Sequence, residues 1–183
     1  MPRLPLPDPP LSDGEVWLRP WSTSDAPAVT AACQDPEIPR WTVVPQPYEE
    51  HHARDFIAGC AVNRESGREL SLAIVDRDDR LLGAIGLAHL HWNDRKGEIG
   101  YWIAREARGR SVAARATRLL SGWAITALGL ERLELLASPE NESSQRVAAK
   151  AGYTREGLMR RYRRRRGSRE DLVMFSLLAE DLR

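Results

Sequence analysis

Residue types suited to binding an anion gather in a six-residue turn near the middle of the chain, Arg108-Gly109-Arg110-Ser111-Val112-Ala113. The apolar run 97–104 before the turn predicts a buried strand, and residues 112–128 after it carry apolar side chains at helical spacing. A helix N-terminus offers unpaired backbone N–H groups and the positive end of the helix dipole. The turn is therefore predicted to hold a phosphate group.

This phosphate turn is neither a Walker loop nor a dinucleotide loop, because Gly-Lys-Ser/Thr and the three-glycine spacing are both missing. It resembles the pyrophosphate loop of the GNAT superfamily of acyl-CoA-dependent N-acyltransferases, whose pattern is Gln/Arg-x-x-Gly-x-Gly/Ala. Ser111 stands where the second glycine is usual. Its N–H can still face a phosphate and its hydroxyl is expected to cap the helix, although the side chain narrows the approach.

Four further segments resemble the branch of this superfamily related to the ribosomal-protein N-terminal acetyltransferases (RimJ/RimL-like). They are Asp35-Pro36-Glu37 with Trp41 and Pro47-Tyr48, residues 98–102, residues 141–147 with 150–153, and Asp171 with residues 176–178. The resemblance covers about residues 14–183. It implies a cytoplasmic bacterial enzyme, with acetyl-CoA as co-substrate, that transfers the acetyl group to an amine acceptor by direct attack.

The resemblance also assigns residues to the co-substrate. Arg108, Arg110 and the backbone N–H groups of residues 109 and 111–113 would bind the pyrophosphate; the alternative for the two arginines is a solvated surface pair. The pantetheine chain would pair with the strand edge at Trp102 and Ile103. Asn141 begins a predicted helix, so it is expected to cap that helix and also to bind the pantetheine arm. The backbone N–H groups near Trp102 and Ile103 would hold the oxyanion.

Amide formation needs a base for the amine and a proton donor for the thiolate. Glu98, at the start of the central strand, is the predicted base; the alternative is a structural carboxylate paired with an arginine. His89 and His91 are the other base candidates. Ser144 is the predicted proton donor, against a plain helix-surface serine. The tyrosine that many family members carry in that helix is missing here, since Tyr153 lies after it.

The acceptor would contact Trp41 and Tyr48, which follow the first helix, and Tyr101 of the central strand. The expected acceptor is a protein or peptide N-terminal α-amine or a related small amine, and the α-amine is the easier to deprotonate, with a pKa near 8 against about 10.4 for lysine. The alternative acceptor is a small molecule such as an antibiotic, a polyamine or an amino-acid derivative. A cleft closed by the loop around Trp41 would favour a small molecule. A CoA-binding regulatory module without catalysis is the alternative of a different class, raised by Ser111 in the phosphate turn.

Charge and composition exclude several other classes. Lys and Arg number 27 and Asp and Glu 26, so the net charge of +1 argues against a dedicated nucleic-acid binder. The arginine run 160–166 is predicted to be a solvated hairpin or a site that attracts an acidic partner. The four histidines and two cysteines form no metal-binding spacing, so no metal is predicted. Homodimer formation is possible, as in other members of the family.

The elements that must position these residues read as one mixed α/β domain over residues 14–183. Seven strands in a mostly antiparallel sheet and about four helices are expected, as in the GNAT fold. Residues 1–13, with five prolines, are predicted to form a flexible arm. No apolar run is long enough to cross a bilayer, which predicts a soluble cytoplasmic protein. The predicted strands are 16–19, 70–76, 81–90, 97–104, 132–137, 153–158 and 171–178, and the predicted helices are about 24–33, 49–63, 112–128 and 141–151.

Overall fold

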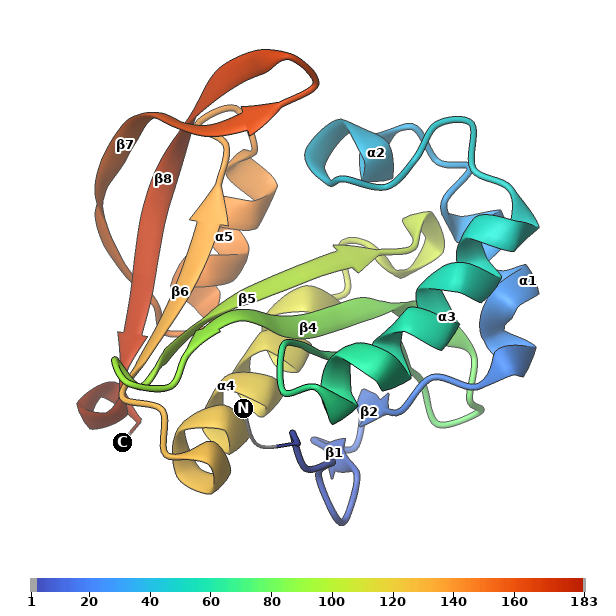
Figure 1. Cartoon of the computed structure of the whole chain (residues 1–183), viewed down its shortest axis with the longest axis horizontal. Helices are drawn as coiled ribbons and strands as arrows, with labels where there is room; N and C mark the ends of the chain where they lie inside the picture. The colour runs from blue at the N-terminus through green and yellow to red at the C-terminus, as the bar shows by residue number, and fades with distance from the viewer. Residues whose placement is uncertain (1–2, 183) are drawn as a thin grey trace.

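The computed structural model describes residues 3–182 and places an eight-stranded sheet at the centre of the chain (Figure 1). Its strand order is β1-β2-β3-β4-β5-β6-β8-β7, and neighbouring strands are antiparallel except for β5 and β6. The strands are β1 (Leu11–Ser12), β2 (Trp17–Arg19), β3 (Leu70–Val75), β4 (Leu81–His91), β5 (Lys96–Ile103), β6 (Arg132–Ala137), β7 (Thr154–Arg165) and β8 (Ser168–Leu178).

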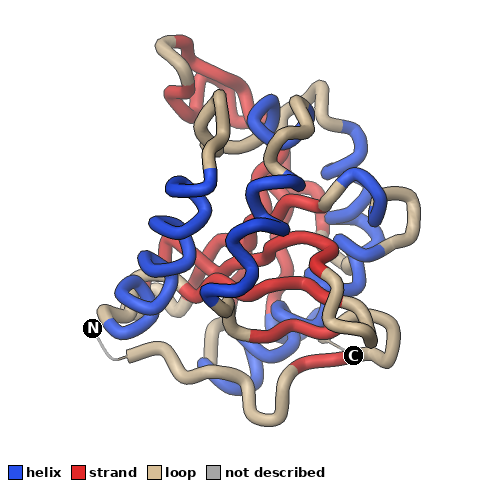
Figure 2. The backbone as a smooth tube through the Cα atoms, turned by 90° about the vertical axis from the view of Figure 1, so that its right-hand side faces the viewer, coloured by secondary structure: helices blue, strands red, loops and turns tan. Residues whose placement is uncertain are grey.

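Helices cover both faces of this sheet (Figure 2). They are α1 (Ala26–Ala32), α2 (Glu37–Trp41), α3 (Glu50–Glu65), α4 (Val112–Leu128) and α5 (Glu142–Lys150). One face packs its Leu, Ile and Val side chains against the apolar stripe of α4, and α1 and α3 form a second core cluster with Trp102 on the other face. None of the helices in the described part of the chain is long and apolar enough to cross a membrane.

The expected mixed α/β architecture is confirmed, with eight strands in place of seven. The additional strand, β1, lies inside the proline-rich segment and is only two residues long, too short for a periodicity signal. A further helix, α2, forms where prolines led us to expect a loop. Pro36 precedes its first residue and Pro39 lies in its first turn, where helix N–H groups have no intrahelical partner.

The N-terminal segment is held against the domain over its described residues, which differs from the flexible arm expected from its prolines. Leu4 is completely buried in the main core. Its N–H donates to the Arg64 carbonyl over 3.1 Å, and its own carbonyl accepts from Arg64 Nη1 over 3.1 Å. One apolar side chain and one arginine at the end of α3 therefore fix a segment of low regular structure.

The sheet opens at its centre, beside the strand that carries most of the predicted site. Strands β5 and β6 pair in parallel only from Lys96 to Glu98, opposite Arg132 to Glu134. Beyond Glu98, β5 continues to pair with β4 as far as Ile103. The second half of β5 therefore presents a free backbone edge on its β6 side.

Side chains of β5 alternate between the two faces of the sheet. Ile99 is buried in the core with α4, whereas Trp102 packs against the cluster of α1 and α3. Gly100 pairs in regular register with Gly86, and a Cβ at Gly100 would meet no atom within 4 Å. A glycine inside a strand often marks a bulge or a close backbone approach, and Gly100 marks neither. Gly100 instead leaves the floor of a cavity open.

Candidate active site

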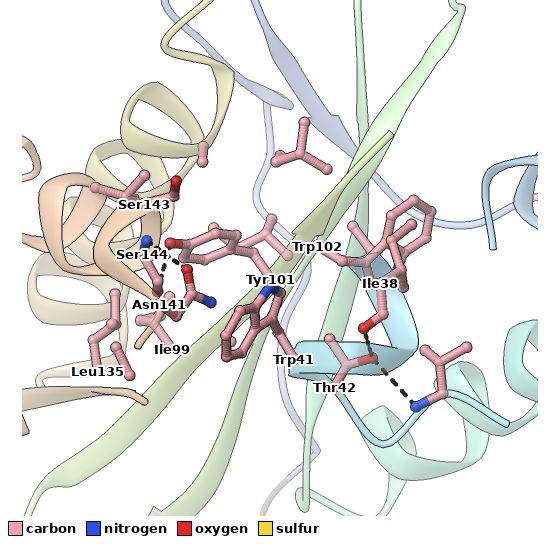
Figure 3. Close-up of a pocket in the computed structure, with 18 of the residues that line it drawn as sticks. Ile38, Trp41, Thr42, Ile99, Tyr101, Trp102, Leu135, Asn141, Ser143 and Ser144 are labelled. Atoms are coloured by element: carbon pink, nitrogen blue, oxygen red, sulfur yellow. Dashed lines mark hydrogen bonds between the residues drawn. The ribbon is translucent and has the colours of Figure 1, made fainter. Parts of the chain in front are cut away.

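A cavity of about 1230 Å³ lies at the open end of β5, between α5 on one side and α2 and α3 on the other (Figure 3). The predicted site residues converge on it from segments far apart in the sequence. Arg110, His89 and His91 do not line it. Those that do are Trp41, Tyr48, Glu98, Tyr101, Trp102, Ile103, Arg108, Gly109, Ser111, Val112, Ala113, Asn141 and Ser144.

The phosphate turn has the predicted position, at the N-terminus of α4. Ser111 is the N-cap residue and adopts a left-handed conformation, with φ of 59° and ψ of 13°. Its hydroxyl makes no capping hydrogen bond, so the expected cap is wrong. The left-handed backbone turns the serine side chain away from the role it has at an ordinary N-cap, where φ and ψ are extended. The free N–H groups of the first turn of α4 still face the cavity side, because Ser111, Val112 and Ala113 line it.

The Arg108 guanidinium contacts other residues of the protein. Its Nε and Nη2 donate to the Ile103 carbonyl over 3.2 and 3.1 Å, at the end of β5. Nη2 also lies 2.7 Å from Asp35 Oδ2, an ion pair whose angle does not make a directed hydrogen bond. Arg110 is exposed and makes no ion pair within residues 3–182. The two arginines of the turn therefore differ, and Arg110 has the free guanidinium.

A pair of hydroxyl groups lies on the α5 side of the cavity. The Tyr101 hydroxyl, from β5, is 2.9 Å from Ser144 Oγ. Figure 3 shows the two side chains pointing toward one another. Asn141 caps α5 as predicted, since its Oδ1 accepts from the Ser144 N–H over 3.0 Å. Burial raises the pKa of Tyr101 to about 12, so the phenol stays protonated at neutral pH. Sequence reasoning placed Tyr101 with the acceptor and missed this pair, because the two residues are 43 positions apart.

Glu98 lines the cavity from β5 and forms an ion pair with Arg163, 3.0 Å away on β7. This ion pair is what the alternative to a catalytic base, a structural carboxylate paired with an arginine, predicts. The side chain of Glu98 remains 19% exposed, so the pair does not seal the carboxylate from the cavity. His89 and His91 lie on the exposed end of β4, outside the cavity lining.

The two predicted acceptor aromatics have different environments. Trp41, at the end of α2, donates from Nε1 to Glu37 Oε2 over 3.1 Å, and the Arg40 guanidinium carbon lies 4.5 Å from the centre of its ring. These contacts fix the indole at the cavity wall. Tyr48 is only 8% exposed and belongs to the core cluster of α1 and α3, and burial raises its pKa to about 12. Tyr48 therefore touches the cavity mainly as part of its supporting wall.

The arginine run lies in the β7–β8 hairpin, which extends further than predicted and reaches toward α2 (Figure 1). Arg163, Arg165 and Glu170 of this hairpin line the cavity. Arg166 Nη2 donates to the Pro39 carbonyl over 2.8 Å, and Arg165 donates to the Arg40 carbonyl and pairs with Glu170. Carbonyls at a helix C-terminus lack intrahelical partners, so these arginines cap α2. We call these contacts the α2–hairpin bridge. The arginine-rich run 160–166 has no alternation of apolar and polar residues that would predict these contacts.

Neither cysteine is placed for nucleophilic chemistry. Burial raises the pKa of both Cys33 and Cys60 to about 11, which keeps the thiols protonated. Neither lines the cavity. No group of three or more His, Cys, Asp or Glu side chains within residues 3–182 is arranged to hold a metal ion.

Comparisons with known proteins agree with this geometry. The family model described as "Acetyltransferase (GNAT) domain" matches residues 15–154. The N-acetyltransferase p20 of Bacillus licheniformis is 28% identical over 165 residues, 90% of this chain and 93% of p20. YdaF of Bacillus subtilis, named provisionally as a ribosomal N-acetyltransferase, is 38% identical over 104 residues, 57% of each chain. Mycobacterium smegmatis RimJ, solved with CoA-disulfide, superposes with a TM-score of 0.82 at 27% identity, covering 94% of this chain and 87% of RimJ.

Proposed function

Because the chain belongs to the GNAT acetyltransferase family, in its RimJ/RimL-like branch, we propose that it acetylates a small primary amine with acetyl-CoA as the donor. The α2–hairpin bridge is the observation that supports a small acceptor. Arg166 and Arg165 connect the hairpin to the end of α2, next to Trp41, and so limit the width of the cavity entrance on this side. A folded protein partner has less room to approach Tyr101 and Ser144 than a small molecule has.

For the donor, we propose that the pantetheine arm pairs with the free edge of β5 beyond Glu98 and that the pyrophosphate binds at the N-terminus of α4. The unpaired length of β5 supports the first assignment, because an extended chain can add to an open strand edge. The exposed guanidinium of Arg110 supports the second. Arg108 would act indirectly by fixing the end of β5.

For the reaction, we propose that the amine nitrogen attacks the thioester carbonyl, the C–S bond breaks, and the acetyl group passes directly to nitrogen. Glu98 would accept the proton that the amine loses, directly or through water. The Ser144 hydroxyl would give a proton to the departing sulfur and regain one from Tyr101, to which it is hydrogen-bonded. The two thiols, which stay protonated at neutral pH, give no support to an acyl-cysteine route.

A protein N-terminal α-amine is the second candidate acceptor. It is favoured by the name of one relative, YdaF, which refers to the ribosome. The same cavity would then admit only the first residues of an extended N-terminus.

The test compares rates of acetyl transfer to small primary amines and to peptides with a free N-terminus, in wild type and in Arg166→Ala. Wild type is expected to use small amines, and Arg166→Ala to gain activity with peptides because one bridge contact is lost. Arg164→Ala is the matched control, since Arg164 is an exposed hairpin arginine that does not line the cavity. A wild-type preference for peptides, unchanged in Arg166→Ala, would favour the N-terminal α-amine instead.

A further inference from the structure

Glu69 is a cavity carboxylate that the reaction described above does not use. It immediately precedes β3 and lines the cavity together with Ser71 and Gly86. A Cβ built on Gly86 would lie 3.7 Å from Glu69 Oε1, so the carboxylate lies close to this glycine on the cavity floor. The floor is formed by small residues of β4 and β5, which leaves space next to the carboxylate.

Among the acidic side chains that line the cavity and are partly buried, Glu69 is the one without a cationic partner in the described chain, whereas Asp55 and Glu140 also lack one but are exposed. Glu98 pairs with Arg163, Glu170 with Arg165, and Glu37 with Arg40. Glu69 forms no ion pair within the described chain, and its one side-chain hydrogen bond is a long contact of 3.5 Å from Asn63 Nδ2. Burial raises its pKa, and the nearby His89 only partly opposes this effect.

A partly buried carboxylate is unfavourable unless something with positive charge or donor groups compensates for the lost hydration. Within the protein that compensation is weak at Glu69, whereas the other partly buried carboxylates of the cavity, Glu37, Glu98 and Glu170, each pair with an arginine. The open side of Glu69 faces the cavity. A ligand that carries a positive charge would supply the missing partner.

The distance from Glu69 to the reacting groups determines where the positive charge of the ligand must lie. Gly86, which Glu69 lies against, pairs in register with Gly100, and Gly100 precedes Tyr101 on β5. Adjacent strands are about 5 Å apart, so the carboxylate lies only a few carbon–carbon bonds from the free edge of β5. Trp102 and Phe56 also line the cavity and offer apolar ring surface.

We propose that Glu69 binds a second ammonium group of the acceptor, so that the preferred acceptor is a small aliphatic diamine. One nitrogen is acetylated at the edge of β5 while the other, protonated, makes a charge-assisted hydrogen bond with Glu69. This inference rests on the proposed acetylation of a small amine and specifies the substrate class. Glu69 is then a specificity-determining residue for the reaction.

The experiment measures kcat and KM with 1,4-diaminobutane and with n-butylamine, which differ only in the second amine. Wild type is expected to favour the diamine, and Glu69→Gln to lose about 10- to 100-fold in kcat/KM for the diamine, mainly through KM. The same variant should change kcat/KM for n-butylamine less than about 2-fold. Glu180→Gln, an exposed carboxylate in the 3-10 turn after β8, is the matched control.

Binding of 1,4-diaminobutane to the CoA-loaded protein by calorimetry gives a second readout that does not depend on turnover. Loss of diamine binding in Glu69→Gln, with partial recovery in Glu69→Asp, would support the proposal. Equal use of diamine and monoamine by wild type would overturn it while leaving amine acetylation intact. Loss of kcat for both amines in Glu69→Gln would also overturn it, because that pattern belongs to a base. Tight CoA binding with no acetylation of any amine would instead overturn the proposed function.

Discussion

Single residues decide how the phosphate turn is built, and Ser111 is the clearest case. It occupies a left-handed backbone conformation with φ of 59°, which glycine adopts without steric cost and serine does not. The hydroxyl gives no capping bond in return. The turn therefore keeps the geometry of a glycine position while carrying a side chain.

Replacing Ser111 by glycine is expected to stabilise the protein by about 1 kcal/mol, because left-handed backbone costs an L-residue about 1–2 kcal/mol. Urea denaturation of wild type and Ser111→Gly measures this difference. Ser111→Ala is the matched control: it removes the hydroxyl but keeps the Cβ, so its unfolding free energy should stay within about 0.5 kcal/mol of wild type. A glycine variant no more stable than the alanine variant would contradict strain at this position.

Tyr101 connects the site to the pH dependence of stability. Its pKa of about 12 in the folded state exceeds the value near 10 of an exposed tyrosine, so the folded protein holds the phenolic proton more tightly than the unfolded chain. This contribution is complete below pH 10 and is lost as the pH rises from 10 to 12. Tyr48, with a pKa of about 12, adds a second contribution of the same sign.

The free energy of unfolding is therefore expected to fall above pH 10, and Tyr101→Phe should make this fall shallower by up to about 1.4 kcal/mol for each pH unit. Urea denaturation at several values between pH 9 and pH 11.5 measures the slope. Tyr162→Phe, on the exposed hairpin, controls for the removal of one tyrosine hydroxyl. An identical slope in wild type and Tyr101→Phe would show that the burial of this phenol has no effect on its proton affinity.

At the scale of elements, Arg108 connects two segments that lie next to the site. It contacts the Ile103 carbonyl at the end of β5 and Asp35 in the loop before α2. Its position in the phosphate turn suggested a pyrophosphate ligand, because sequence shows which residues share a turn but not which way each side chain extends. The contact with Asp35 spans 73 positions and has no local signal.

Arginine-to-alanine substitutions separate these two roles. Arg108→Ala is expected to reduce the free energy of unfolding by about 1–3 kcal/mol, because Asp35 loses its partner while only 12% exposed. Arg110→Ala should leave stability within about 0.5 kcal/mol and weaken CoA binding about 10-fold, as expected for one charge-assisted contact. Thermal unfolding and calorimetry with CoA measure the two quantities. If Arg108→Ala instead weakened CoA binding and Arg110→Ala reduced stability, Arg108 would be the direct phosphate ligand.

Much of the fold follows from the sequence because its signals are local. The helix 112–128, its start at the phosphate turn and the cap at Asn141 depend on spacing and residue type within a few positions. The α2–hairpin bridge, the Tyr101–Ser144 pair and the isolation of Glu69 depend on contacts between distant segments. The first group could be predicted, and the second required the tertiary structure.

The N-terminal segment belongs to the scale of the whole molecule, since it ties the edge of the sheet to the end of α3. Composition predicted a free arm, because five prolines dominate residues 1–13, yet the buried side chain of Leu4 and the pairing of β1 with β2 hold the segment against the domain. Leu4 lies in the main core cluster, whereas Leu6, two residues later, is 37% exposed. Leu4 and Leu6 therefore allow a buried and an exposed leucine of the same segment to be compared.

Leu4→Ala is expected to cost about 2–5 kcal/mol of unfolding free energy, the range for a buried leucine replaced by alanine. Leu6→Ala should cost less than about 1 kcal/mol, because much of its side chain already contacts water. Because Leu4 also exchanges backbone contacts with Arg64, its loss should expose the end of α3 to faster amide hydrogen exchange than in Leu6→Ala. Equal stabilities of the two variants would mean that the segment does not share the cooperative unfolding of the domain, and that the flexible arm read from its prolines is the better description in solution.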